Sequence, residues 1–398
     1  MLDRIHNGHV LGVAAFFVPI LGLYAPRGLA PLVIVVALVA VAVRWRRGGP
    51  WPVPRHAAAI VLAGLIAWAA ASLAWTIAPP AAAARNLASL AVLVACGLVV
   101  VEIAAGLDAA ERRSFVRGLL AGFIVALALF AVERAADYPL RRVLPLRNDS
   151  PNTLQQAFNR GLTVMALVAF PVALALWRWS RLAAIGAWAA TLALLAVMPS
   201  SAAIAALAAG GAVAALAYAA PRVTPAALGA ALLAAVLVAP IGGQTIPAPA
   251  DFPQEATALP GSAHHRLMIW RFTAQRVSER PLLGWGFDSS RWIPGRAESL
   301  GTGEPALPLH PHNAALQWWL ELGLPGALIG AAFLTVLVAG IARHLPGRAE
   351  AAAGQALLVS ATVVAGVSYG AWQGWWIAAL ALSAALMAAA ASAKPPSA

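Results

Sequence analysis

The chain is predicted to be an all-α integral membrane protein with about twelve transmembrane helices and one long loop outside the bilayer. Hydrophobic residues make up 61% of its 398 residues and charged residues only 11%, whereas soluble domains carry about 25% charged residues. Apolar runs of about 20 residues, the length that crosses a bilayer, recur along the chain and are interrupted for long only at 244–312. A soluble fold is therefore excluded, and the single cysteine, Cys96, excludes an intramolecular disulfide.

Twelve candidate spans can be drawn from the hydropathy pattern. Many are rich in Ala and Gly, as expected where helices pack closely in lipid. No soluble domain, internal repeat or broken helix is evident, so we divide the chain into 1–243 with nine spans, the loop 244–312, and 313–398 with three spans and a cytoplasmic tail. The expected spans are residues 9–25, 29–45, 57–77, 86–106, 114–136, 156–177, 181–199, 201–220, 223–243, 313–342, 351–371 and 373–393.

Basic residues beside the spans predict the orientation of the chain. Arg44, Arg46 and Arg47 mark the second connection as cytoplasmic. Alternation from there places both termini inside and puts the 137–155 and 244–312 loops outside. The net charge of +12 is spread over many loops and no recognition motif accompanies it, so we expect no nucleic-acid partner.

Four arginines crowd the short 137–155 loop and the end of the span before it, against the expected charge distribution. One interpretation is that they bind an anionic ligand. The other is that they pair with Glu133, Asp137 and Asp149, and the sequence leaves both open. The four are Arg134, Arg141, Arg142 and Arg147.

The 244–312 loop is far longer than an ordinary connection, and loops of this length are usually functional or disordered. Its residues 262–279 have helical spacing, and Arg280-Pro281 ends this expected helix. The loop closes with His310-Pro-His312-Asn313 at the start of the tenth span. Two imidazoles where a polar loop meets a membrane helix are candidates for acid–base chemistry near neutral pH.

Three motifs resemble the O-antigen ligase family, in the family's order, over the central third to half of the chain. The run from His310 to Gly326, HPHNAALQWWLELGLPG, resembles the family's outer-loop exit. Arg266-Leu-Met-Ile-Trp270, followed by PLLGWG at 281–286, is similar to its loop helix, and Asn159-Arg160 to its Asn-Arg pair. One departure is Ser-Ser-Ala at 200–202, where the family often has Ser-Arg, which removes one possible anion contact.

The resemblance implies a GT-C-like glycosyltransferase of the bacterial inner membrane whose active site faces the periplasm. The expected donor is a glycan on undecaprenyl pyrophosphate and the expected acceptor is a sugar hydroxyl of lipid A-core, so membrane lipid carries both. An O-antigen polymerase, which extends the lipid-linked glycan, uses similar geometry and stays open as an alternative. A twelve-span transporter is a second alternative, although the repeats and broken helices typical of transporters are not evident.

Such a transfer assigns roles to three residues. His312 is the expected general base, because a sugar hydroxyl is a poor nucleophile; otherwise it is a histidine at the start of a span. Arg266 is expected to bind the pyrophosphate through bidentate hydrogen bonds, unless it pairs with Glu255 or Glu279. Arg160 is expected to act similarly, because an arginine within a span is costly without a function, unless it snorkels to the interface.

Four further residues are expected to contact substrate, namely His310, Asn313, Arg142 and Arg147. We expect no cofactor. We also expect no metal site, because no cluster of carboxylates accompanies the histidines and arginines can neutralise the leaving pyrophosphate. Gln317 and Glu321 are interpreted as polar residues that pack helices together.

Overall fold

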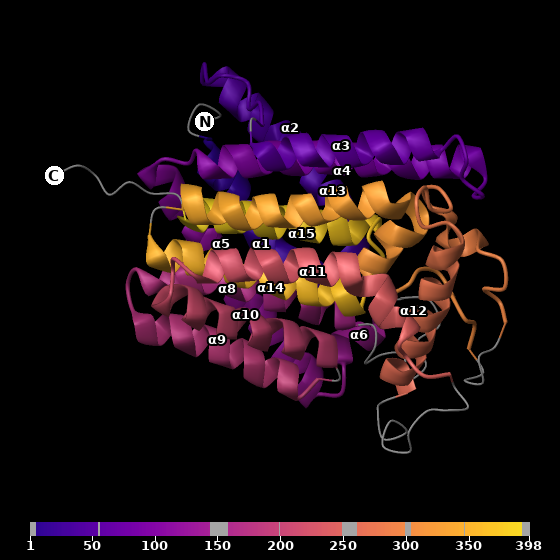
Figure 1. The fold of residues 1–398 in the computed structure, drawn as a ribbon. Coiled ribbons are helices and arrows are strands. Elements are labelled where there is room, and N and C mark those ends of the chain that lie inside the picture. The colour runs from indigo at the N-terminus through magenta and orange to yellow at the C-terminus, as the bar shows by residue number, and fades with distance from the viewer. Residues whose placement is uncertain are drawn as a thin grey trace.

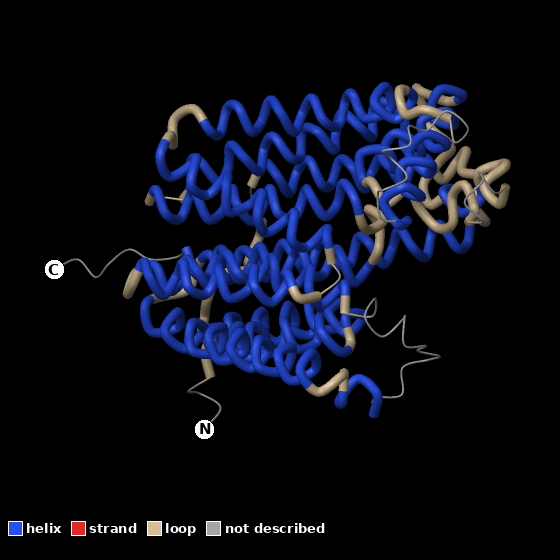
Figure 2. Tube along the Cα trace, turned by 90° about the horizontal axis from the view of Figure 1, so that it is seen from below, coloured by secondary structure: helices blue, strands red, loops and turns tan. Residues whose placement is uncertain are grey.

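In the computed structural model the described residues are 5–54, 56–143, 158–198, 200–248, 261–298, 304–345 and 347–391. They form a bundle of long helices that run roughly along one direction, with one helix, α12, lying outside the bundle at one of its ends (Figure 1). A view turned by 90° shows that most of the longer loops gather at this same end (Figure 2). The described residues contain no β-sheet, which confirms the all-α fold class.

The long helices follow the hydropathy pattern closely. The elements are α1 (Asn7–Tyr24), η2 (Pro26–Gly28), α2 (Leu29–Arg46), α3 (Ala57–Ser72), α4 (Pro80–Ala105), α5 (Ala109–Ala135), α6 (Pro139–Val143), α8 (Asn159–Trp177), α9 (Arg181–Ala196), α10 (Ser201–Ala219), α11 (Thr224–Gln244), α12 (Gly261–Glu279), η5 (Ser289–Trp292), α13 (Ala314–His344), α14 (Arg348–Val367) and α15 (Gly374–Ala391).

Each expected span coincides with a helix, and the helix expected within the long loop is α12. Ten stretches of the described residues, with η2 and α2 counted as one, are long and apolar enough to cross a membrane. The helices α3 and α9 are apolar but have only 16 residues each. The multi-pass membrane fold is confirmed, and the count of twelve spans stays a prediction.

The helix α8 forms the centre of the bundle. Its span has the largest buried share, 78%, and it packs against α1, α9, α14 and α15. Around it, α1 and α5 approach so closely that a Cβ on Gly118 would lie 2.1 Å from the carbonyl oxygen of Gly12. Small residues allow such contacts between helices in lipid. The buried position of α8 fixes its first turn, which carries Arg160, at the α12 end of the bundle.

The helix α13 is broken at Gly323, whose φ of +64° and ψ of −161° are not helical. One uninterrupted span was expected at 313–342, and the break corrects this expectation. The loop at 281–286 fills the gap, because the N–H groups of Trp285 and Gly286 each donate to a carbonyl oxygen of α13 at 2.8 Å. The α12 loop is thereby bound to the bundle by backbone hydrogen bonds as well as by side chains.

Candidate active site

The helix α12 brings Arg266 to the loop that carries His312. The indole N–H of Trp270 donates to the carbonyl oxygen of Pro311 at 3.1 Å. Residues four apart lie on one face of a helix, so Arg266 is one turn from this contact. The side chains of Arg266 and His312 are close enough for the arginine's charge to disfavour protonation of the imidazole.

His312 is oriented by the backbone at the end of α14. Its Nδ1 forms a short hydrogen bond with the carbonyl oxygen of Ser368. A carbonyl oxygen can only accept, so Nδ1 carries the proton and Nε2 of the neutral ring keeps its lone pair. The backbone of His312 has a φ of +56°, a left-handed conformation that is uncommon outside glycine. The ring is thus held by an unusual local conformation and by a hydrogen bond at Nδ1, and Nε2 remains available as the basic nitrogen.

The environment of His312 keeps its imidazole neutral. Burial lowers its pKa below the usual 6.5, the hydrogen bond to the Ser368 carbonyl opposes this, and the nearby Arg266 and His265 lower the pKa further. A neutral imidazole with a free Nε2 can accept a proton at neutral pH. The arrangement therefore suits a general base better than a structural cation.

Arg266 and Arg160 converge on Tyr369, which follows α14. Both guanidinium groups interact electrostatically with its phenol, and the Arg160 guanidinium lies 5.5 Å from the centroid of the Trp375 ring. No carboxylate among the described residues pairs with either arginine. Burial lowers the pKa of Arg266, yet a guanidinium stays charged at neutral pH. Two half-buried cations without an acidic partner form a site suited to an anion.

The hydroxyl hydrogen of Tyr369 is engaged by Thr163. Its oxygen lies 3.2 Å from the hydroxyl of Thr163, which itself donates to the carbonyl oxygen of Asn159 at 2.9 Å. Thr163 can then only accept from Tyr369, so the lone pairs of the phenol oxygen are not used in this hydrogen bond. Burial raises the pKa of Tyr369, which keeps it a neutral phenol. Tyr369 was not among the site residues predicted from the sequence.

His310 and Asn313 have structural contacts on either side of His312. The His310 ring is buried, its Nδ1 accepts from the backbone N–H of His312 at 3.2 Å, and its Nε2 lies 2.9 Å from Nε2 of Gln373. Burial lowers its pKa to about 3. The side-chain oxygen of Asn313 accepts from the backbone N–H of Leu316 at 3.0 Å and caps α13. Their expected contacts with substrate stay predictions.

A buried polar cluster around Glu321 joins the α12 loop to the bundle. Its carboxylate accepts from the indole N–H of Trp372 at 2.8 Å, from Gln317 at 3.0 Å, and from the side chain of Ser290. The amide oxygen of Gln317 in turn accepts from the backbone N–H of Ala371 at 2.8 Å. The interpretation of Gln317 and Glu321 as packing residues agrees with these contacts, which also fix the segment after Tyr369.

With this geometry established, comparison with known proteins adds independent information. Residues 156–331 match a family model described as O-antigen ligase. This part of the chain is similar to O-antigen ligases. The matched region contains Arg160, Arg266 and His312, whereas Ser368 and Tyr369 follow it in sequence. The matched region therefore receives two of its contacts from the segment between α14 and α15, beyond its own end.

Curated relatives agree with the family. A protein of Rickettsia conorii named "Putative polysaccharide ligase" is 37% identical over 133 residues, covering 32% of each chain. Proteins of the same name from Rickettsia felis and Rickettsia prowazekii are 36% identical over 135 residues and 35% identical over 136 residues. The alignments span about a third of the length of these relatives.

Of the four arginines in and before the 137–155 loop, Arg142 forms one of the expected carboxylate pairs, and Arg134 donates to the carbonyl oxygen of Val197 at 3.3 Å. Arg142 is exposed and forms an ion pair with Asp137. Arg141 is buried, its backbone N–H donates to Glu133 at 3.1 Å, and its guanidinium lies 5.7 Å from the Phe158 ring centroid. Arg147 lies outside the described residues, so its expected role, like that of Arg142, stays a prediction.

Of the two carboxylates considered as partners of Arg266, one pairs with a different arginine. Glu279 pairs with Arg276, with 2.6 Å between Nη1 and Oε1, and Glu255 lies outside the described residues. Arg27, in η2, adds a third cation close to Arg160.

Among the described residues, no group of three or more His, Cys, Asp or Glu side chains could hold a metal ion.

Proposed function

We propose that the protein transfers a glycan from undecaprenyl pyrophosphate to a sugar hydroxyl of lipid A-core on the periplasmic face of the bacterial inner membrane. His312 acts as general base, and Arg266 and Arg160 bind the pyrophosphate. The similarity of residues 156–331 to O-antigen ligases supports the reaction class. The placement of a neutral imidazole beside two arginines that lack a carboxylate partner among the described residues supports the assignment of roles.

The chemistry is a single displacement at the anomeric carbon of the donor. Nε2 of His312 takes the proton of the acceptor hydroxyl as its oxygen forms the new glycosidic bond. The bond between the anomeric carbon and the pyrophosphate oxygen breaks, and undecaprenyl pyrophosphate leaves with the bonding electrons. The guanidinium groups of Arg266 and Arg160 stabilise the negative charge that grows on the leaving oxygen.

One observation carries this proposal, namely the hydrogen bond from Nδ1 of His312 to the Ser368 carbonyl. It fixes the tautomer, and so leaves Nε2 as the basic atom on the ring that interacts with Arg266. A capping histidine at the start of α13 would not require this arrangement, because Asn313 already caps the helix.

The same geometry serves an O-antigen polymerase, in which the acceptor is a second lipid-linked glycan. The acceptor side distinguishes the two, and we favour the ligase because its exit motif is well marked. A transporter fits less well. The break in α13 is filled by the backbone of residues 281–286 and does not line a cavity for a solute, as broken helices of transporters do.

The different roles proposed for His312 and Arg266 predict different defects when each residue is replaced. His312→Ala should still bind the lipid-linked donor but lose transfer by about 10²- to 10⁴-fold, because only the proton transfer needs the base. Arg266→Ala should weaken both donor binding and transfer, and Arg266→Lys should restore them in part, because a point charge does not reproduce the bidentate fork. Donor binding and initial rates in proteoliposomes separate the two.

Equal loss of donor binding in both alanine variants would contradict these roles, provided that each inserts and purifies like the wild type. Lipopolysaccharide from a deletion strain distinguishes ligase from polymerase. Lipid A-core that carries no transferred glycan, while lipid-linked glycan accumulates, indicates a ligase. Core carrying a single repeat unit indicates a polymerase.

We further propose that transfer needs no divalent metal, since the arginines supply the positive charge that a metal would otherwise bring to the pyrophosphate. Purified protein should keep its rate in excess EDTA. Loss of the rate in EDTA, with recovery on adding magnesium or manganese, would refute this part of the proposal and leave the role of His312 to be tested separately.

A further inference from the structure

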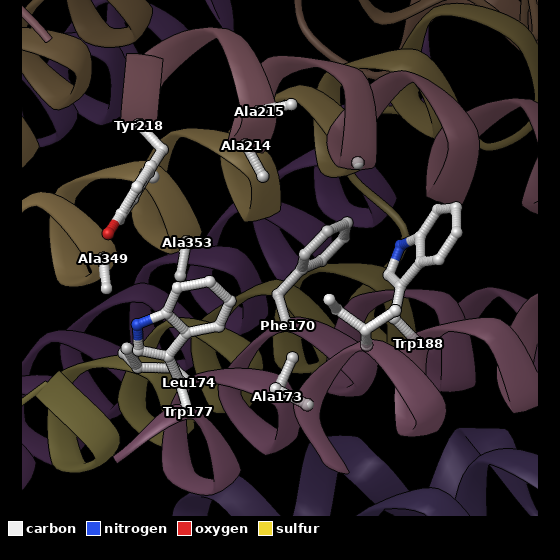
Figure 3. A pocket seen from close by; sticks show the side chains of 14 residues that line it. Phe170, Ala173, Leu174, Trp177, Trp188, Ala214, Ala215, Tyr218, Ala349 and Ala353 are labelled. Atoms are coloured by element: carbon white, nitrogen blue, oxygen red, sulfur yellow. The ribbon is translucent and has the colours of Figure 1, made fainter. Parts of the chain in front are cut away.

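An apolar cavity of about 440 Å³ lies between α8, α9, α10 and α14, far from the candidate active site. Its walls include Phe170 and Trp177 of α8, Trp188 of α9, Tyr218 of α10 and Ala353 of α14 (Figure 3). These residues lie in the C-terminal half of α8 and near the start of α14, whereas Arg160 starts α8 and Tyr369 follows α14. The cavity is therefore at the end of the bundle opposite to His312.

The cavity exists because the four helices pack in two pairs. The helix α9 packs mainly on α8 and α10 mainly on α14, which leaves space between the pairs, and many of the side chains facing it are alanines. Gly211 of α10 lets the Trp188 ring lie against its backbone, since a Cβ there would be 2.6 Å from the indole. Ile185 lines the cavity and is 56% exposed, so the cavity opens on the surface that faces lipid.

The shape and the lining fit an acyl chain. Along α8 the cavity reaches from Trp177 to Phe170, which is about 10 Å at the rise of an α-helix and less than the half-thickness of a bilayer. Its volume falls within the range of about 300–1,000 Å³ that is typical of ligand sites. Its walls are apolar apart from the indole N–H groups of Trp177 and Trp188 and the hydroxyl of Tyr218, so most of the surface that a hydrocarbon chain would contact is itself hydrocarbon.

The mouth of the cavity is polar and positively charged. Figure 3 shows the indole nitrogen of Trp177 and the hydroxyl of Tyr218 on the same side, near Ala349. The guanidinium of Arg181 lies 5.3 Å from the Trp177 ring centroid; this side chain is exposed and has no acidic partner among the described residues. Arg178, by contrast, already pairs with Glu350 at 3.1 Å. A free cation at the entrance of an apolar cavity complements a lipid with a negative headgroup.

We propose that this cavity binds one anionic glycerophospholipid, with an acyl chain between α8, α9, α10 and α14 and the phosphate beside Arg181. On the orientation proposed above, the lipid comes from the cytoplasmic leaflet, so it is distinct from the donor and acceptor. It acts as a bound lipid that completes the packing of the four helices. The site takes no part in the transfer reaction, and its test does not depend on activity.

Native mass spectrometry of the detergent-purified chain, titrated with phosphatidylglycerol or with phosphatidylethanolamine of the same acyl chains, tests the proposal. One phosphatidylglycerol should bind about fivefold more tightly, because an arginine at the membrane surface contributes that much to binding an anionic lipid. Arg181→Gln should remove the preference while leaving binding of phosphatidylethanolamine. Arg46→Gln, which removes an exposed charge at the end of α2, is the matched control and should keep the preference.

Filling the cavity provides the second measurement. Ala214→Leu with Ala353→Leu should weaken binding of both lipids at least about tenfold, because excluding even two methylene groups removes that much affinity. Ala208→Leu with Ala212→Leu, at exposed positions on α10, should leave binding unchanged. Equal binding of the two headgroups to the wild type, wild-type affinity in the filled variant, or a lipid-free dimer in place of the complex would each overturn the proposal.

Discussion

Backbone atoms, and not a second ionisable side chain, set the orientation of His312. The Ser368 carbonyl fixes the proton on Nδ1, and the backbone of His312 has a φ of +56°. A carbonyl partner does not titrate, so the tautomer stays the same over the whole physiological pH range. The basicity of Nε2 is then governed by burial and by the neighbouring cation.

The pH dependence of transfer should report this environment. The pKa of His312 lies below 6.5 because of burial and the charge of Arg266, so the base is neutral and active at pH 7 and above. Activity should be constant there and should fall only as the pH drops through this lowered pKa. Initial rates in proteoliposomes from about pH 4.5 to 8 check this against the usual histidine value of about 6.5. An acid limb at or above that value would contradict the assignment.

Individual residues of the site were predictable to different degrees. Arg160, Arg266 and His312 could be chosen because each lies in a motif that resembles the O-antigen ligase family, and because a titratable or charged group beside an apolar run is costly without a function. Tyr369 could not, since an aromatic residue between two spans normally belongs to the interfacial belt. Its hydrogen bond to Thr163 joins residues 206 positions apart, and no local pattern encodes a contact of that range. The ion pair between Arg142 and Asp137 was one of two interpretations that the sequence left open, the other being contact with an anionic ligand.

Among the elements, α13 depends most on one position. Gly323→Ala should lower stability by about 2 kcal/mol or more, because the φ of +64° disfavours any side chain. Its Cβ would also lie 2.3 Å from the carbonyl oxygen of Leu282. Thermal unfolding of the purified protein measures the effect. Gly340→Ala, in the same helix with no atom near its Cβ, is the matched control and should change stability by less than about 1 kcal/mol.

A Gly323→Ala protein that unfolds at the same temperature as the Gly340→Ala protein would show that the break is not required.

Hydropathy predicted the helices well because lipid demands long apolar runs with internally paired backbones. It could not predict the break, because Gly323 and Pro325 resemble the small and kinking residues that ordinary membrane helices tolerate. The loop at 281–286 supplies hydrogen bonds in place of those that the helix loses at the break, and this is a tertiary contact.

At the scale of the whole molecule, the orientation in the membrane is open to direct measurement. Ala297 lies in the loop at the α12 end, and Trp51 lies in the connection between α2 and α3; both are exposed. In a Cys96→Ala background, Ala297→Cys should react with an impermeant maleimide in intact spheroplasts. Trp51→Cys should react only after permeabilisation, because the basic residues of its connection favour the cytoplasm. The reverse pattern would place the candidate active site in the cytoplasm and remove the proposed substrates from its reach.

The hydrogen bond between Trp270 and Pro311 has a consequence for how such a chain can diversify. It joins two residues 41 positions apart, so the intervening polypeptide leaves and returns at one point while Arg266 and His312 stay fixed on either side of it. Residues 281–286 are held against α13, and Ile293, Ala306 and Leu307 are buried in one cluster with Ile269 of α12, whereas Pro294, Ala297 and Glu298 are exposed. A lineage could exchange such exposed residues to suit a new acceptor sugar and inherit the proton-transfer and phosphate-binding residues unaltered.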